Sequence, residues 1–118
     1  MEDSRTASEI ITAEVTSWNG VTTGPGRFGA QAFKFENREI GHLHGDHAAH
    51  FAFPKDQSAE LKKAGRVVDH PLGEKYKGLA ARRIEDEHDV WQVIELMRLN
   101  YDRIVDRVDV SAAVAGKT

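Results

Sequence analysis

The sequence contains no cysteine among its 118 residues. This absence excludes disulfides, thiolate zinc sites, iron–sulfur clusters and cysteine nucleophiles together. Long apolar runs are missing as well, because no stretch approaches the roughly 18 residues that a membrane span needs. The first ten residues, MEDSRTASEI, also lack the basic and apolar segments of a signal peptide. We therefore expect a soluble, cytoplasmic protein that has no membrane partner.

An excess of charge of one sign is missing too. Sixteen basic residues stand against 19 acidic ones, which gives a formal net charge of −3. Short basic clusters occur at 62–66 and 82–83, but no broad positive field would attract a polyanion. We predict no nucleic-acid partner, and the composition leaves the oligomeric state open. A chain of this length suits one domain, 1–118, since domains usually have about 100–150 residues.

The hydrophobic periodicity changes several times along the chain. Thr6 and Glu9 have the spacing of a capping box at the start of a helix. The pattern as a whole predicts these segments: a helix at 6–18, strands and turns at 21–53, a short helix at 55–64, brief strands at 66–70 and 75–84, a long helix at 86–108, and a frayed tail at 109–118.

This order favours an α+β fold. Short turns between successive strands are typical of antiparallel rather than parallel sheets. We predict an antiparallel sheet of about four to six strands, flanked by an N-terminal helix, a short middle helix and a long C-terminal helix.

Histidine is the one enriched residue of chemical interest. Five of the six histidines lie between residues 42 and 70. If 39–44 is a regular strand, His42 and His44 share a face with Ile40, because side chains alternate along a strand. Leu43 and Glu39 would then lie on the opposite face. Asp46, just beyond this strand, is predicted to orient an imidazole and raise its basicity.

Three interpretations of this segment stay open. His42 and His44 could hold zinc or iron(II) together with one of His47, His50 or His70. They could instead serve as acid–base groups in a pocket for an organic ligand. The third interpretation is that they are polar strand positions satisfied by backbone partners. His47 and His50, taken individually, are expected in a surface loop.

Several motifs together resemble the luciferase domain family. The resemblance covers nearly the whole chain, although His50 stands where an acidic residue is expected and Tyr76 opens a strand that commonly carries tryptophan. The matching motifs are Trp18-Asn19-Gly20-Val21, Gly26-Arg27-Phe28-Gly29, Phe33, Glu39-Ile40-Gly41-His42-Leu43-His44-Gly45-Asp46, Phe53-Pro54, Leu61, Gly65-Arg66, His70 and Leu96-Met97-Arg98-Leu99-Asn100-Tyr101.

The resemblance implies an oxidoreductase of the monooxygenase type that needs no cofactor. Fungal luciferase, usually placed in this family, oxidises a hydroxylated styrylpyrone with molecular oxygen. By that likeness, His42 or His44 would take a proton from an enol or hydroxypyrone, and Asp46 would orient the base.

Arg27 would hold the resulting oxyanion, because a guanidinium stays charged and offers several donors. The other interpretation of Arg27 is a surface arginine paired with Glu36 or Glu39. Phe28, Trp18 and His70 complete the predicted substrate-binding set, and no metal ligand is assigned. The alternative to an enzyme is a non-catalytic ligand- or metal-binding module that uses the segment around His42 and His44.

Overall fold

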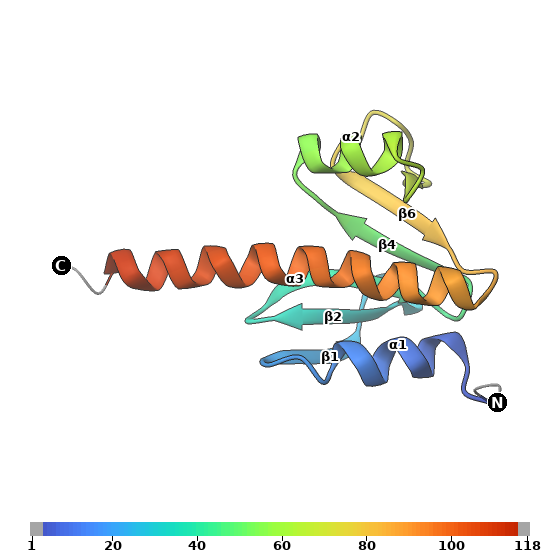
Figure 1. The fold of residues 1–118 in the computed structure, drawn as a ribbon, viewed down its shortest axis with the longest axis horizontal. Coiled ribbons are helices and arrows are strands. Elements are labelled where there is room, and N and C mark those ends of the chain that lie inside the picture. The colour runs from blue at the N-terminus through green and yellow to red at the C-terminus, as the bar shows by residue number, and fades with distance from the viewer. Residues whose placement is uncertain (1–3, 116–118) are drawn as a thin grey trace.

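The computed structural model describes residues 4–115, with side chains described as far as residue 109. Helices and strands follow one another in the predicted order (Figure 1). The elements are α1 (Ala7–Val15), β1 (Val21–Pro25), the 3-10 turn η1 (Arg27–Gly29), β2 (Gln31–Phe35), β3 (Arg38–His44), β4 (Ala48–Ala52), α2 (Lys55–Lys63), β5 (Val68–Asp69), β6 (Leu79–Arg83) and α3 (Glu87–Ala115).

The six strands form one antiparallel sheet in the order β1-β2-β3-β4-β6-β5. The predicted α+β class and the three flanking helices are confirmed. Strand β6 lies between β4 and β5, so the short β5 forms one edge of the sheet and β1 forms the other. An edge strand of two residues leaves few backbone groups free to pair with another chain.

The helices begin and end for identifiable local reasons. The Thr6 hydroxyl accepts a hydrogen bond from the Glu9 amide, and the Glu9 carboxylate accepts one from the Thr6 amide, so the predicted capping box is confirmed. Helix α3 continues to Ala115, so the prediction of a frayed tail was wrong for residues 109–115. Residues 116–118 lie outside the described residues. No helix within residues 4–115 has the length and apolar character needed to cross a membrane.

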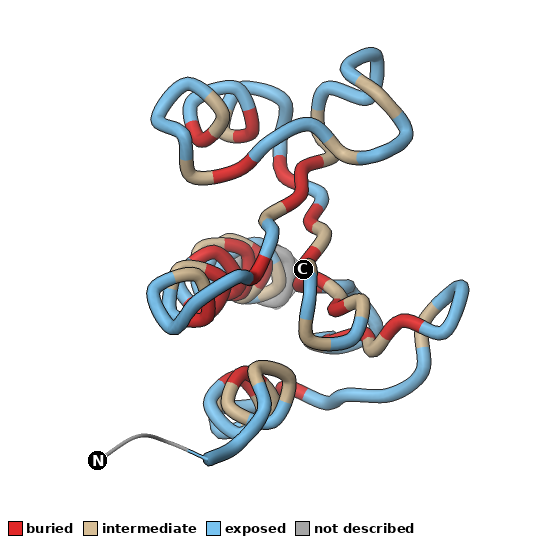
Figure 2. Tube along the Cα trace, turned by 90° about the vertical axis from the view of Figure 1, so that its right-hand side faces the viewer, coloured by how far each residue is buried: buried red, intermediate tan, exposed pale blue. Residues whose placement is uncertain are grey.

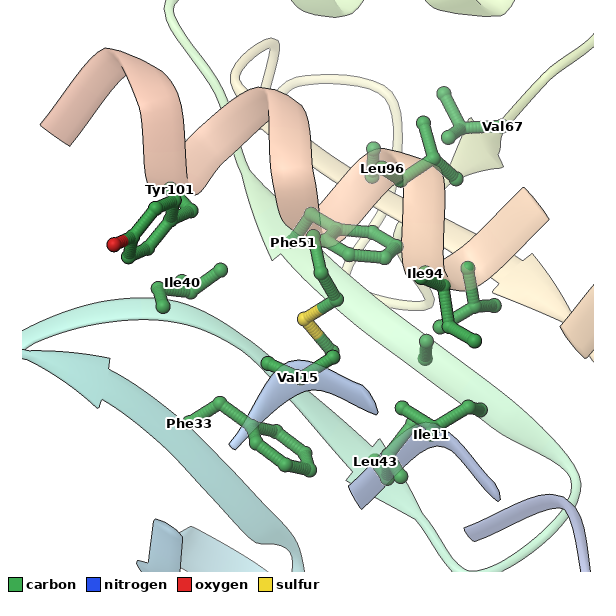
Figure 3. Close-up of a cluster of buried hydrophobic side chains, with 14 of the residues drawn as sticks. Ile11, Val15, Phe33, Ile40, Leu43, Phe51, Val67, Ile94, Leu96 and Tyr101 are labelled. Atoms are coloured by element: carbon green, nitrogen blue, oxygen red, sulfur yellow. The ribbon is translucent and has the colours of Figure 1, made fainter. Parts of the chain in front are cut away.

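The hydrophobic core lies between one face of the sheet and helices α1 and α3. Figure 2 shows the buried segments gathered where these helices meet the strands. In Figure 3, side chains from both helices converge on those of β2, β3 and β4. All three α-helices within residues 4–115 contribute to this core, and the loop around η1 lies over the other face of the sheet. Fully buried core residues include Ile11, Val15, Phe33, Ile40, Leu43, Phe51, Leu96 and Met97.

A β-bulge interrupts the pairing of β2 with β3. Phe33 pairs with Gly41 and Lys34 with Glu39, which leaves Ile40 as the extra residue. Ile40 therefore joins Leu43 in the core, and the predicted arrangement, with Ile40 beside the histidines and Glu39 on the core face, was wrong. The bulge reverses the alternation at this one position and brings Glu39 to the face that carries His42.

The buried amide of Asn100 joins α3 to two strands. Its Nδ2 donates to the carbonyl oxygens of Ile40 and of Ala52, each at 3.0 Å. Its Oδ1 accepts two hydrogen bonds from the Arg103 guanidinium, at 3.1 and 2.7 Å. Ile40 is the bulged residue and Ala52 ends β4, so Asn100 satisfies carbonyls that lie outside the β3–β4 pairing.

We expect Asn100→Leu to destabilise the fold by about 2–4 kcal/mol, because it leaves two backbone carbonyls without their donor. Urea unfolding followed by circular dichroism measures the free energy of unfolding. Asp102→Asn is the matched control in the same helix, since its exposed pair with Arg98 contributes about 0.5 kcal/mol or less. Equal losses in the two variants would contradict the role given to Asn100.

Gly41 is packed so closely that a methyl group does not fit. A Cβ at this position would lie 2.8 Å from the Met97 sulfur and 3.0 Å from the Phe51 ring. We expect Gly41→Ala to lower the free energy of unfolding by about 1–3 kcal/mol through overpacking. Gly24→Ala is the control, because no atom lies within 4 Å of its added Cβ. A Gly41→Ala variant as stable as Gly24→Ala would contradict this packing.

Candidate functional site

A single row of paired residues crosses the open face of the sheet. The register pairs Gly24 with Ala32, Ala32 with His42, His42 with His50, and His50 with Ala81. Directly paired residues of neighbouring strands share a face. Two histidines therefore stand side by side in the middle of the face, and small residues flank them on both sides.

His44 and His70 complete a cluster of four imidazoles with these two, which we call the histidine cluster. The ring centroids of His44 and His50 lie 4.3 Å apart, and those of His42 and His50 lie 5.2 Å apart. His70, which follows β5, lies 4.4 Å from His50 by the same measure. The His50 ring is thus in contact with three other imidazoles from β3 and from the segment after β5.

Burial, with the crowding of the imidazoles, lowers the pKa of three rings in the cluster. Burial, reinforced by His44, His70 and His42, lowers the pKa of His50 to about 4. Burial also lowers the pKa of His44 and of His70, with neighbouring imidazoles adding to the effect. A protonated imidazole among the others would be repelled by any second charge. At neutral pH these three rings are therefore uncharged.

Glu39 sets the orientation of His42. Its Oε2 lies 3.1 Å from Nδ1 of His42, and this hydrogen bond is the main reason that the pKa of Glu39 is lowered. An ionised carboxylate only accepts, so Nδ1 of His42 donates the proton. In the uncharged form of His42, the lone pair of the ring then lies on Nε2.

A cavity of about 720 Å³ lies over the histidine cluster. The loop around η1 forms one wall: Gly26 lies against Ala32, since its added Cβ would meet that of Ala32 at 3.4 Å. Pro71 and Leu72 form the opposite wall, and Lys34 and Glu39 close one end. The site is therefore a hollow with an imidazole floor and walls supplied by two loops. A second hollow, of about 710 Å³, near Asp46 and Trp91 lies away from the cluster.

Phe28 lies at the rim of this cavity in an unusual conformation. Its side chain is 95% exposed, and its backbone has φ 56° and ψ 36°. The left-handed region costs an ordinary residue about 1–2 kcal/mol. The backbone conformation of Phe28 is therefore strained, and burial of its side chain does not offset that cost. Such strain is often found where a side chain meets a ligand.

The structure brings most of the predicted site residues together. His42, His44, Arg27, Phe28 and His70 all line the cavity. Arg27 is exposed, and within the described part of the chain it forms no ion pair with Glu36 or Glu39. The guanidinium is therefore available at the rim.

Asp46 and Trp18 lie elsewhere. Oδ1 of Asp46 accepts a hydrogen bond from the Ser8 amide at 2.8 Å, near the start of α1, and this contact lowers its pKa. Trp18 packs against Tyr101 with ring centroids 5.4 Å apart, on the helical side of the sheet. Neither residue lines the cavity. Glu39, rather than Asp46, is the carboxylate that orients an imidazole.

The sequence offered His50 only as one of three alternative third metal ligands, and taken individually it was expected in a surface loop. It lies in β4 directly opposite His42. The available signal was the hairpin itself: a turn at 45–47 places residues 42 and 50 opposite each other. The sequence does not fix the register of β3 against β4, and a shift of one residue would turn the His50 side chain to the other face of the sheet. The pairing of His42 with His50 was therefore not predicted.

The luciferase domain family model matches residues 37–100, more than half of the 118 residues. The chain belongs to the luciferase domain family. All four residues of the histidine cluster and Asn100 lie within the matched segment, whereas Arg27 and Phe28 precede it. No curated protein and no solved structure matches the sequence. The nearer relation to fungal luciferase stays a prediction.

The lowered pKa of His50 makes stability depend on pH. Between about pH 6.5 and 4, the His50 imidazole is protonated in the unfolded protein but stays neutral in the folded protein. The free energy of unfolding is therefore expected to fall as the pH falls through this window. Urea unfolding at several pH values should show a shallower fall for His50→Gln, in which this group no longer titrates.

His88→Gln is the control for this measurement, because His88 is exposed in the first turn of α3, away from the cluster. Its pH profile should follow that of the parent. A His50→Gln profile identical to the parent's would show that His50 is not held neutral by its surroundings.

Proposed function

We propose that this luciferase domain protein binds a small, planar, acidic organic molecule over the histidine cluster and oxygenates it without a cofactor. The observation that carries the proposal is the cavity of about 720 Å³ with imidazoles for a floor, three of which have a lowered pKa. Cavities that take small molecules usually measure about 300–1,000 Å³ and combine apolar walls with a few polar groups.

The walls suit a flat, partly apolar ligand. Phe28 and Leu72 stand on opposite sides and are 95% and 59% exposed. An aromatic or pyrone ring bound between them would cover apolar surface that water now contacts. The small side chain of Ala32 leaves room for the ligand beside the histidines.

The rim supplies positive charge for an anion. Arg27 and Lys34 both line the cavity. A guanidinium offers several donors in one plane, which fits an enolate or pyrone oxygen. These two residues would stabilise the negative charge that forms when the ligand loses its acidic proton.

The proposed reaction begins with that proton. A lone pair of His44 or His42 takes the hydrogen of the enol O–H group, and the electrons of the broken bond remain on the ligand as an enolate. The electron-rich carbon of the enolate then reacts with molecular oxygen, forming a C–O bond to a peroxide. The carbon is oxidised, the oxygen is reduced, and no further electron donor is needed.

A non-catalytic binding module is the second candidate function, because the cavity alone needs only to hold the ligand. Oxygen consumption separates the two candidates. A module would bind the hydroxypyrone and consume no oxygen.

The test uses 4-hydroxy-6-methyl-2-pyrone and protein treated with a chelator. We expect this pyrone to bind the parent protein and raise its melting temperature, since a ligand of the folded form adds stability. Phe28→Gly should weaken binding by about 2- to 12-fold, the equivalent of one aromatic contact. It should leave the melting temperature without ligand unchanged or higher, because glycine adopts a positive φ without strain.

Arg27→Gln should weaken binding further and remove much of its dependence on salt, since the exposed charge at the rim is screened by ions. Trp91→Ala is the matched control for the loss of an exposed aromatic, because Trp91 is half exposed and lines a different hollow. Binding that is insensitive to Phe28 and Arg27 would contradict the proposed site.

A further inference from the structure

Three of the four imidazoles in the histidine cluster can reach a single point. One ring nitrogen each from His42, His44 and His50 lies within 4.8 Å of the other two. Nitrogens bound to one tetrahedral ion stand about 3.3 Å apart when each bond measures about 2.0–2.1 Å. Side-chain rotations would bring the three nitrogens from within 4.8 Å of one another to this shorter spacing, because all three residues project from the paired strands β3 and β4.

We infer that His42, His44 and His50 bind one divalent first-row transition-metal ion, for which Zn²⁺ is the representative case. Imidazole nitrogens suit zinc, iron, nickel and copper, whereas magnesium and calcium prefer oxygen ligands. Metal binding needs only these side chains, so the inference goes beyond the proposed function and does not rest on it.

His42 is already prepared as a ligand. Its Nδ1 donates to Glu39, and its lone pair is therefore on Nε2. A carboxylate that holds the second nitrogen of a metal-binding histidine fixes the ring and raises its basicity, an arrangement that recurs in zinc sites. The bulge at Ile40 is what places Glu39 within 3.1 Å of this ring.

His50 carries an unsatisfied polar atom. Its Nδ1 is buried and has no hydrogen-bond partner, which ordinarily costs about 1–3 kcal/mol. A metal ion bound at this nitrogen would supply the missing partner.

His70 is excluded as a fourth ligand by its own hydrogen bond. The Leu72 amide donates to Nδ1 of His70 at 3.1 Å. This bond occupies the lone pair, and the neutral ring then carries its proton on Nε2. His70 is therefore a hydrogen-bond donor beside the three ligands, and a tetrahedral ion would keep one coordination position open to the cavity.

Metal binding and the proton transfer proposed above use the same lone pairs. The metal-loaded and metal-free forms are therefore distinct states of the cluster. Zn²⁺ at one equivalent should suppress oxygen consumption that depends on His42 or His44 as a base. Metal binding without any pyrone turnover would refute the proposed function alone, and turnover without metal binding would refute this inference alone.

The experiment titrates untagged, chelator-treated protein with Zn²⁺ by calorimetry and with Co²⁺ by visible absorption. We expect one equivalent of each ion, and for Co²⁺ the intense visible bands of a four-coordinate site. Mg²⁺ should give no binding. Glu39→Gln should weaken Zn²⁺ binding by about 10- to 100-fold, as loss of a supporting carboxylate does elsewhere.

Single substitutions His42→Gln, His44→Gln and His50→Gln should each weaken Zn²⁺ binding by more than Glu39→Gln does. His88→Gln and His70→Asn are the controls, and both should keep one equivalent of Zn²⁺ at the parent's affinity. Circular dichroism and thermal unfolding establish that each variant is folded, which is expected because all three ligands lie outside the hydrophobic core.

No stoichiometric binding of Zn²⁺ or Co²⁺ by the parent protein would overturn the inference. A loss in His88→Gln equal to that in His50→Gln would also overturn it, since binding would then be scattered over surface imidazoles. A loss in His70→Asn equal to that in His44→Gln would overturn the assignment of three ligands.

Discussion

The geometry of the open face depends on how α3 is fastened to the sheet. The amide of Asn100 donates to the carbonyl oxygens of Ile40 and Ala52, one in the bulge and one where β4 ends. These hydrogen bonds stabilise the bulge against a regular pairing, because a regular strand would remove Ile40 from the core. The bulge in turn brings Glu39 to His42. A buried helix side chain on one side of the sheet thus determines which carboxylate reaches the histidines on the other.

Local signals along the chain were sufficient to predict most of the fold. These signals depend only on residues that are close together in the sequence. They are the capping box at Thr6, Gly65 with φ 74° after α2, and the apolar stripe of α3. The end of α3 was placed too early, since the alanine-rich segment after Val108 has high helix propensity but little apolar periodicity. Strand order and the bulge depend on contacts between distant residues, which such signals do not contain.

The candidate site was predictable in part for the same reason. His42 and His44 are two residues apart and share a face by alternation alone. His50 joined them only through the β3–β4 register, and Glu39 only through the bulge. Asp46 was a reasonable choice of carboxylate by proximity in sequence, yet the Ser8 amide occupies it. The spacing of His42 and His44 in the sequence was enough to predict a site built from imidazoles. The pairing of the strands determined which other residues, His50 and Glu39, belong to it.

The cross-strand row has a further consequence for how such a site can change. Ala32 lies beside the paired histidines, lines the cavity and has little side chain of its own. The width of the cavity therefore depends in part on a position that takes no part in proton transfer or ligation. Replacing Ala32 by a bulkier residue would narrow the cavity without changing any imidazole. Within this architecture, ligand selectivity and chemical reactivity can diverge independently.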